Sequence, residues 1–259
     1  MKTQKLQKVF FSPTGGTLKI LNQVSEGLLT PSDSDLDLTL RTPDSWQATP
    51  NTLCLIGMPV YSGRLPQLAR QRFQKINGAG QWAVILVTYG NRAYDDALIE
   101  LYDAATDAGF KVLGAAAFVA EHSYSTALQP IASGRPSTDD QEKARQFGAA
   151  LRKKLEVPTP LPSVPGHRPY KSLKAAPAQC PETLNDRCTL CGTCVDVCPT
   201  SAIHIGQGIQ TQAELCIFCC ACIKSCPQQA RIFTSPAIQA TSDRLFAACK
   251  EPLQPEYFL

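Results

Sequence analysis

The sequence of 259 residues has no apolar run long enough to cross a membrane. Ser12 and Pro13 interrupt its first apolar segment before the core of a signal peptide can develop. It also has no long basic run and no arginine stripe with interleaved aromatics, and its formal net charge is only +3. We therefore expect a cytoplasmic protein with no membrane span and no nucleic-acid partner.

Two nucleotide-binding motifs are missing as well. No lysine follows the glycines of the loop at residues 12–17, although an ATP-binding P-loop needs one there. The dinucleotide pattern G-x-G-x-x-G does not occur either. ATP and NAD sites are therefore not expected.

Cysteine, by contrast, is abundant, with twelve residues in a chain that shows no export signal, and this favours metal ligation over disulfides. Eight of them form two C-x-x-C-x-x-C-x-x-x-C-P runs, and every cysteine of the first run recurs in the second at one constant offset. The first run is Cys188, Cys191, Cys194 and Cys198 with Pro199, and the second is Cys216, Cys219, Cys222 and Cys226 with Pro227. This agreement in register indicates an internal duplication.

The spacing within each run is typical of iron–sulfur ligation. Two-residue gaps bring three thiolates to one face of a cubane cluster, and in two-cluster proteins the fourth cysteine ligates the other cluster. One 4Fe–4S cluster then takes Cys188, Cys191, Cys194 and Cys226, and the other takes Cys216, Cys219, Cys222 and Cys198. The alternative is a pair of zinc sites, because C-x-x-C pairs also suit tetrahedral Zn²⁺. The third cysteine and the trailing Cys-Pro favour the two clusters.

Four further cysteines lie outside this scheme. Cys220 follows a ligand directly, and we interpret it as a thiol that does not bind the cluster. Cys54 stands alone in an apolar strand and is expected to act as a small hydrophobe. Cys180 and Cys249 are given no redox role. The two runs resemble those of bacterial two-cluster ferredoxins, and the resemblance covers roughly residues 181–235.

The first part of the chain alternates strand-length and helix-length segments, which predicts a doubly wound α/β domain over residues 1–157. Strands are expected at 9–11, 36–40, 52–57, 82–89 and 112–120, and helices at 17–29, 66–76, 94–109 and 138–155. A proline-rich stretch at 158–180 then predicts an extended linker, and residues 236–259 form a tail after the cysteine runs. Tyr257 and Phe258 in this tail suit packing against a domain or against a second subunit in a homodimer, and the sequence leaves both open.

A phosphate site is predicted where the first strand meets the first helix. Unpaired N–H groups at a helix N-terminus, hydroxyl groups and glycines together suit a phosphate group. The residues concerned are Ser12, Thr14, Gly15, Gly16 and Thr17. The same pattern also serves as an ordinary helix cap.

Two further loops should meet this one at the carboxyl edge of the sheet. The loop after the third strand offers a rigid backbone and a ring for stacking, in Pro59, Val60, Tyr61 and Gly63. The loop after the fourth strand offers backbone amides and an amide side chain, in Thr88, Tyr89, Gly90, Asn91 and Tyr94. His122 and Ser123 follow the fifth strand on the same rim. One interpretation is that they reach a flavin or a substrate, and the other, which we favour, is that the histidine faces solvent.

The loop at residues 12–17 resembles the phosphate loop of flavodoxins, which implies a five-stranded parallel sheet in the order 2-1-3-4-5 and bound FMN. The chain as a whole is similar to fusions of a flavodoxin-like domain with a small α+β ferredoxin domain, often called EFR1-type ferredoxins. This resemblance extends the flavin contacts to Pro59, Tyr61, Gly63, Tyr89, Gly90 and Asn91.

The expected function is a relay of single electrons between two 4Fe–4S clusters and FMN, with a redox protein as partner. One alternative is an FMN-dependent reductase of a small organic substrate, for which the sequence identifies no catalytic acid or base. Another is an interaction module stabilised by zinc.

Overall fold

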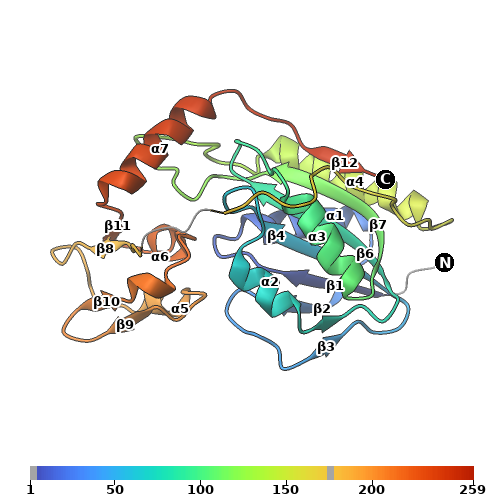
Figure 1. Cartoon of the computed structure of the whole chain (residues 1–259), viewed down its shortest axis with the longest axis horizontal. Coiled ribbons are helices and arrows are strands. Elements are labelled where there is room, and N and C mark those ends of the chain that lie inside the picture. Colours follow the sequence, from blue (N-terminus) through green and yellow to red (C-terminus); the bar gives the residue numbers. More distant parts are fainter. Residues whose placement is uncertain (1–4, 174–177) are drawn as a thin grey trace.

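The computed structural model describes residues 5–173 and 178–259. Its first part alternates strands and helices as the sequence predicts (Figure 1). The strands are β1 (Lys5–Phe10), β2 (Ser32–Asp37), β4 (Thr52–Pro59), β6 (Trp82–Tyr89) and β7 (Lys111–Val119). The helices are α1 (Gly16–Leu28), α2 (Gln67–Phe73), α3 (Ala97–Asp107) and α4 (Thr138–Lys154). A small parallel pair, β3 (Trp46–Gln47) and β5 (Ile76–Asn77), lies outside the main sheet.

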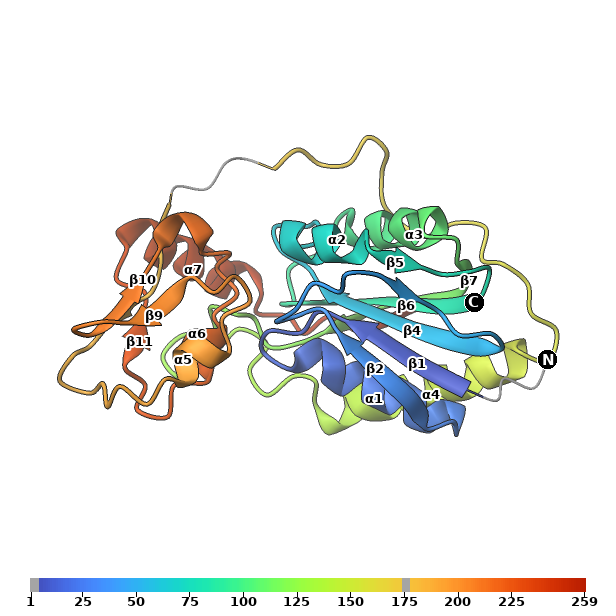
Figure 2. The same cartoon turned by 90° about the horizontal axis from the view of Figure 1, so that it is seen from below.

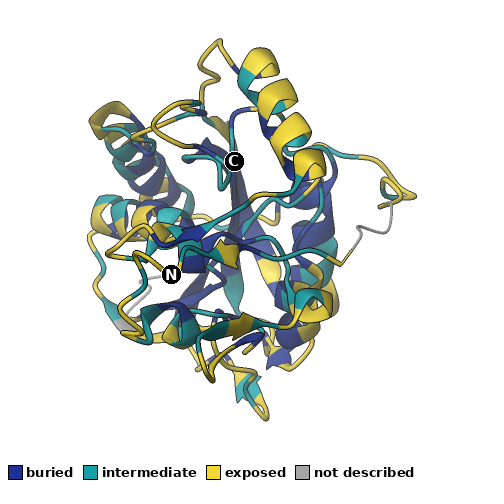
Figure 3. Cartoon of the chain, turned by 90° about the vertical axis from the view of Figure 1, so that its left-hand side faces the viewer, coloured by how far each residue is buried: buried dark blue, intermediate teal, exposed yellow. Residues whose placement is uncertain are grey.

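The main sheet has the order β12-β7-β6-β4-β1-β2, and β1, β2, β4, β6 and β7 are parallel. Numbered among themselves, these five strands lie in the order 2-1-3-4-5. Side chains of α1 and α4 pack on one face of the sheet, and side chains of α2 and α3 pack on the other. The inner strands are therefore buried on both faces, which accounts for their continuous apolar sequences (Figure 3).

The expected count of five strands is wrong, because the tail adds a sixth. β12 (Glu256–Phe258) pairs antiparallel with β7. Tyr257 stacks on Phe147 and lies 5.8 Å from the ring of Phe118, while Phe258 packs against the core of the opposite face. Three residues are too few for an alternating pattern to be recognised. The second strand is also displaced, since β2 ends at Asp37 and not at residue 40.

The proline-rich stretch is extended, as expected, and parts of it are buried. Leu161 and Val164 belong to the core beneath α3, and the N–H of Leu161 donates to the carbonyl of Val112. The carboxylate of Asp96 accepts the N–H groups of His167 and Lys171 at 2.9 and 2.6 Å. Residues 174–177 of the predicted linker lie outside the described residues.

The cysteine-rich part is built from two similar halves. Its elements are β8 (Glu182–Thr183), α5 (Thr193–Asp196), β9 (Ile203–Ile205), β10 (Ile209–Thr211), the 3₁₀ turn η1 (Ala213–Leu215), α6 (Ala221–Lys224) and β11 (Arg231–Ile232). Helices α5 and α6 are separated by the same interval as the two cysteine runs. β8 pairs with β11 and β9 pairs with β10, both antiparallel, so each half contributes one strand to each pair.

This part lies beyond the carboxyl ends of the parallel strands, beside the loops that follow β4 and β7 (Figure 2). Ile217 packs against the core of the sheet, and Lys224 forms a 2.6 Å ion pair with Glu121. Helix α7 (Pro236–Ala248) then leads the chain back to β12. None of the helices in the described residues combines the length and apolar character that a bilayer span requires.

Candidate functional site

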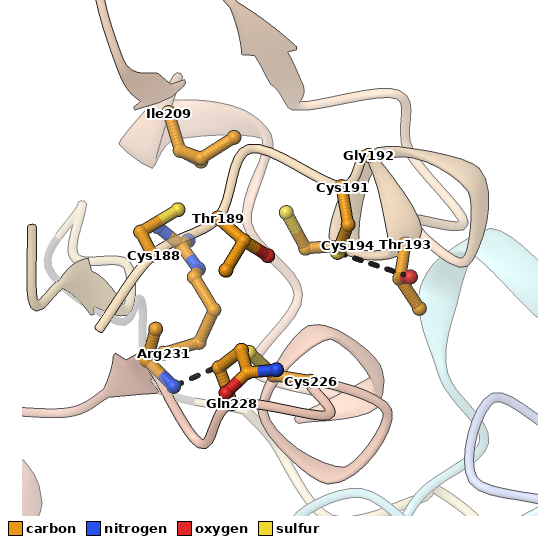
Figure 4. Close-up of a pocket in the computed structure, with 11 residues that line it drawn as sticks. Cys188, Thr189, Cys191, Gly192, Thr193, Cys194, Ile209, Cys226, Gln228 and Arg231 are labelled. Atoms are coloured by element: carbon orange, nitrogen blue, oxygen red, sulfur yellow. Dashed lines mark hydrogen bonds between the residues drawn. The ribbon is translucent and has the colours of Figure 1, made fainter.

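The cysteine-rich part contains two cavities. The first is shown in Figure 4 and lies between α5, β10 and β11. Its cysteines are Cys188, Cys191, Cys194 and Cys226. Three come from the first run and one from the second, which is the predicted crosswise set. Gly192 and Arg231 also line this cavity, and sequence reasoning overlooked Arg231.

The second cavity is its counterpart in the other half. Its cysteines are Cys198, Cys216, Cys219 and Cys222, again the predicted crosswise set, together with Cys220. Apolar side chains complete the wall, among them Ile217, Phe218 and Phe233. The second cavity is the one nearer the sheet, because Ile217 reaches the core of the α/β part.

The backbone turns at the same places in both runs. Leu190 and Gly192 have positive φ in the first run, and Phe218 and Cys220 have positive φ at the equivalent positions of the second. Left-handed residues of this kind turn the chain sharply, so that successive cysteines face a common space. Cys220 therefore occupies the conformation that glycine occupies in the first half, with φ of 60° against 82°.

The donor set fits an iron–sulfur cluster. Burial raises the pKa of Cys219 to about 12 and that of Cys222 to about 11, so these thiols stay protonated unless a metal takes the place of the proton. Within residues 5–173 and 178–259, no three His, Cys, Asp or Glu side chains are grouped tightly enough for a single metal ion. Each cavity offers the four thiols of one crosswise set, which is the donor set that a larger, four-iron body requires.

Four cysteines lie outside the crosswise sets, and one of them, Cys220, also lines the second cavity. The thiol of Cys220 donates to the carbonyl of Phe218 at 3.6 Å, in keeping with its interpretation as a thiol that does not bind the cluster. Cys54 is fully buried in β4, and burial raises its pKa to about 12, as expected for a small hydrophobe. The thiol of Cys180 faces the carbonyl of Thr211 at 3.9 Å, and Cys249 is buried after α7.

Hydrogen bonds of Ser12 fix the loop between β1 and α1. The hydroxyl of Ser12 accepts the N–H of Leu18 at 3.1 Å, and the N–H of Ser12 donates to the hydroxyl of Thr39. Gly15 adopts φ of 82° with open space around it, and Thr14 and Gly15 are exposed. The tip of the loop is thus accessible at a helix N-terminus, the setting in which N–H groups receive an anion.

The third predicted hydroxyl of this loop is turned away from the tip. Thr17 and Thr88 are both buried, and their hydroxyl oxygens lie 2.7 Å apart. This bond ties the loop after β1 to the end of β6. Thr17 and Thr88 therefore support the rim from below, whereas we predicted direct contacts with a ligand.

The loop after β4 is a tight turn. The backbones of Tyr61 and Arg64 bond to each other, and Gly63 has φ of 83°. A Cβ atom on Gly63 would lie 2.1 Å from a carboxylate oxygen of Asp95, so only glycine fits. Pro59 and Val60 are partly buried, and the N–H of Val60 donates to the carbonyl of Thr88.

Tyr61 lies where the sheet meets the second cavity. Burial raises the pKa of its hydroxyl well above the usual range, and the nearby thiols of Cys219 and Cys220 act in the same direction when they are ionised. The tyrosine predicted to stack on a flavin is therefore also close to the cysteines of the second run. No sequence pattern announces this proximity, since it depends on how the two parts pack.

The loop after β6 departs from expectation at Asn91. Both amide hydrogens of Asn91 donate to tail carbonyls, of Cys249 and Glu251, each at 2.9 Å, and its oxygen accepts the N–H of Leu253 at 2.8 Å. The predicted contact of this side chain with a flavin is corrected accordingly, because its donors are used by the tail. The hydroxyl of Tyr94 likewise donates to Glu256.

Two other residues of this loop are packed against neighbours. Tyr89 is buried and lies edge-on to Tyr94, at 5.5 Å between ring centroids. Gly90 lies beneath the ring of His122, at a distance that leaves no room for a Cβ atom. His122 is partly buried and its Nδ1 accepts the N–H of Tyr124, so the solvent-facing placement predicted for it is wrong.

Aromatic rings connect this rim with the second cavity. His122 lies 5.4 Å from Tyr124, Tyr124 lies 5.9 Å from Phe233, and Phe233 stacks on Phe218 at 6.1 Å. Phe218 and Phe233 were missed at the level of the sequence, because isolated aromatic residues carry no local signal.

Comparison with known proteins identifies part of the cysteine-rich region. Residues 181–204 match the 4Fe-4S binding domain family. No curated protein matches the sequence. The match covers the first cysteine run together with β8, α5 and the start of β9.

Several solved structures are similar to part of this chain. A flavodoxin from the domain Archaea is 12% identical, with a TM-score of 0.37, over 59% of this chain and 99% of that chain. Megasphaera elsdenii flavodoxin in its two-electron reduced state is 16% identical, with a TM-score of 0.39, over 57% and 98%. A Streptococcus pneumonia flavodoxin is 17% identical, with a TM-score of 0.37, over 57% and 98%.

Proposed function

We propose that this protein is an electron carrier that holds two 4Fe–4S clusters and one FMN. The observation that carries the proposal is the composition of the two cavities, each lined by three cysteines of one run and one of the other. Crossed ligand sets of this kind are those of two-cluster ferredoxins. The match of residues 181–204 to 4Fe-4S binding domains supports the first of them.

The chain's own residues supply the surroundings that such clusters need. Apolar side chains such as Ile203, Ile209 and Phe218 line the cavities and limit the access of water. The Sγ atom of Cys226 accepts the N–H of Ala230 at 3.2 Å, a backbone hydrogen bond of the kind that tunes cluster ligands. When bound, the clusters supply one-electron chemistry, and FMN supplies storage of one or two electrons.

For the flavin, three loops at the carboxyl edge of the sheet support the proposal. The open tip at Thr14 and Gly15 suits a phosphate, and Pro59, Val60 and Gly90 are partly exposed residues of the other two loops. Tyr61 lies in one of these loops and is close to Cys219 and Cys220. The expected contacts are thus retained for the backbone and for Tyr61, and withdrawn for the side chain of Asn91.

The arrangement also favours an order of electron flow. Cys191 of the first cavity is exposed, whereas Cys219 of the second is buried next to the rim. We propose that a redox partner exchanges electrons at the first cavity, and that the second lies between it and the flavin. Because the second cavity is buried, electrons that reach it would pass to the flavin of the same chain and not to another protein.

Anaerobic purification with iron, sulfide and flavin analysis tests the proposal. We expect about eight irons, about eight sulfides and about one FMN per chain. Absorption bands and an electron paramagnetic resonance signal of reduced 4Fe–4S clusters should accompany them. Zinc in place of iron would overturn the cluster assignment, and FAD or no flavin would overturn the FMN assignment.

A further inference from the structure

Arg231 is a buried cation at the centre of the cysteine-rich part. Only 2% of its surface is exposed, and it lies in β11 opposite Thr183 of β8. Its side chain lines the first cavity together with Cys188 and Cys226 (Figure 4). Burying a guanidinium group costs free energy unless its donors and its charge find partners, so the surroundings of each nitrogen are informative.

Two of these nitrogens bridge the halves of the duplication. One Nη atom donates to the hydroxyl of Thr183 at 2.5 Å, and the other donates to the hydroxyl of Thr211 at 2.8 Å. The two threonines are separated by the same interval as the cysteine runs, so they hold equivalent positions in the two halves. A group that binds equivalent atoms of both halves lies near the approximate twofold axis that relates them. The charge of Arg231 therefore lies between the two cavities.

The duplication also shows that this charge is not required by the packing. The residue of the first half that is equivalent to Arg231 is Ile203, which pairs with Thr211 as Arg231 pairs with Thr183. Ile203 is buried, with its side chain packed against Cys194 and Cys222. One half thus satisfies this position with an aliphatic side chain, and the other half places a cation there. A comparison of the repeats in the sequence is the signal that reveals it.

The third nitrogen of the guanidinium group is Nε. Within the described part of the chain, the Nε atom of Arg231 is buried and has no hydrogen-bond partner. A buried donor without an acceptor is costly, and the side chain that carries this donor lines the first cavity, beside its cysteines. Sulfur atoms of a bound cluster are acceptors of N–H hydrogen bonds, and such bonds raise the reduction potential.

We propose that Arg231 is a tuning residue shared by both clusters, which raises their reduction potentials by its charge and by a hydrogen bond from Nε to a cluster-bound sulfur. The inference rests on the proposed function. Reduction adds one electron to a site that is already negative, and a buried cation stabilises that added charge more strongly than an exposed one does. Burial also keeps solvent ions from screening this interaction.

The test is a redox titration of the full chain, holding its clusters, with dithionite as reductant under anaerobic conditions. The variant Arg231→Ile installs the residue found at Ile203. We expect its midpoint potentials, followed by electron paramagnetic resonance, to move to more negative values by at least a tenfold change in the redox equilibrium, about 59 mV for one electron. The matched control is Arg187→Ile, because Arg187 precedes Cys188 and is exposed, and its loss should produce a much smaller shift.

Iron analysis separates the possible failures. If the wild-type chain binds no clusters, the proposed function itself fails. If wild type and Arg231→Ile both hold their iron, and the two arginine variants shift the potentials equally or not at all, the role of Arg231 is overturned. Should Arg231→Ile lose its clusters, Arg231→Gln, which keeps hydrogen-bonding groups without the charge, takes its place, with the same negative shift expected and the same result overturning the proposal.

Discussion

The guanidinium group of Arg72 donates a 2.6 Å hydrogen bond to the carbonyl oxygen of Pro199, the residue that follows Cys198. Arg72 belongs to α2 and is only 8% exposed. It also donates to the carbonyls of Leu38 and Thr39 beyond the end of β2. A single buried side chain therefore joins the carboxyl edge of the sheet to a loop of the second cavity.

Replacing Arg72 with methionine should destabilise the chain, because three carbonyl groups would lose a charged donor. We expect a loss of about 2–4 kcal/mol in the free energy of unfolding, measured by anaerobic urea denaturation. Arg70→Met is the matched control on the same helix, since the side chain of Arg70 is 45% exposed and its ion pair with Glu100 is long, at 3.5 Å. That variant should lose less than about 1 kcal/mol, and equal losses would contradict the role of Arg72.

Crosswise ligation predicts how pairs of cysteine variants combine. Cys191 and Cys226 line the same cavity although they belong to different runs, so Cys191→Ala with Cys226→Ala should remove one cluster and about half of the iron. Cys191→Ala with Cys198→Ala affects both cavities and should remove nearly all of it. Iron and sulfide analysis distinguishes the two, and the reverse result would indicate ligation within each run. Cys220→Ser should leave the iron content unchanged.

Ser12→Ala should weaken the binding of FMN selectively. The hydroxyl of Ser12 fixes the start of α1 through the N–H of Leu18, and losing such a cap costs about 1 kcal/mol. We therefore expect FMN to bind about five- to tenfold more weakly in fluorescence titrations of apoprotein. Riboflavin, which lacks the phosphate, serves as the comparison ligand and should be affected little. Equal weakening of both ligands would place the phosphate elsewhere.

Asn91→Ala should loosen the attachment of the tail without weakening the binding of FMN. Its side chain makes three hydrogen bonds, all to residues 249–253, and leaving those backbone groups unpaired should cost about 2–3 kcal/mol. We expect faster proteolysis within the tail and unchanged affinity for FMN. Weaker FMN binding with an intact tail would restore the contact that the sequence originally suggested.

The free energy of unfolding should decrease as the pH is lowered, because His122 takes up a proton when the chain unfolds. Burial, followed by the charges of Lys224 and Arg92, lowers the pKa of this imidazole from 6.5 to about 4. Its neutral form, whose Nδ1 accepts the N–H of Tyr124, is thus the form that the fold stabilises. This contribution is complete above pH 6.5 and is lost as the pH falls towards 4, to a maximum of about 3 kcal/mol.

Urea denaturation between pH 7 and pH 5 measures the effect of His122. The control is His122→Asn, which keeps a hydrogen-bond acceptor but does not titrate in this range. We expect the wild type to lose more stability than the variant over the interval. Parallel pH profiles for the two proteins would show that His122 is free to take up its proton in the folded state.

The strands and helices of the α/β part were predictable because their signals are local. Continuous apolar runs such as residues 82–89 mark buried parallel strands, and Ser137 caps α4 with a reciprocal bond to Asp140. The duplication was likewise predictable, because the cysteines of the two runs repeat at one constant interval in the sequence. The displaced β2 has neither signal, since its sequence, SDSDLD, is polar and lies at the edge of the sheet.

Contacts between distant segments were not predictable. Asn91 was assigned to the flavin because the tail that takes its hydrogen bonds is 158 or more residues away in sequence. The same holds for Arg72 with Pro199, and for the position of Tyr61 beside the second cysteine run. A residue type can suggest a chemistry, but its partner is chosen by packing. The wider resemblance to EFR1-type ferredoxins, the domain bounds and the flavin contacts other than that of the Asn91 side chain stay predictions.

Helix α7 leads the chain back to the sheet, where β12 pairs with β7. The last strand of the sheet therefore comes after the cysteine-rich part in the sequence. The cysteine-rich part is an insertion before the last strand of the sheet, tethered at its entrance and at its exit. A module attached by one flexible linker samples a large volume. A module that is attached at both ends, with one attachment hydrogen-bonded into a sheet, stays close to the other part of the chain. The proposed electron transfer between cofactors of the two parts would then be a first-order process, whose rate does not depend on the protein concentration.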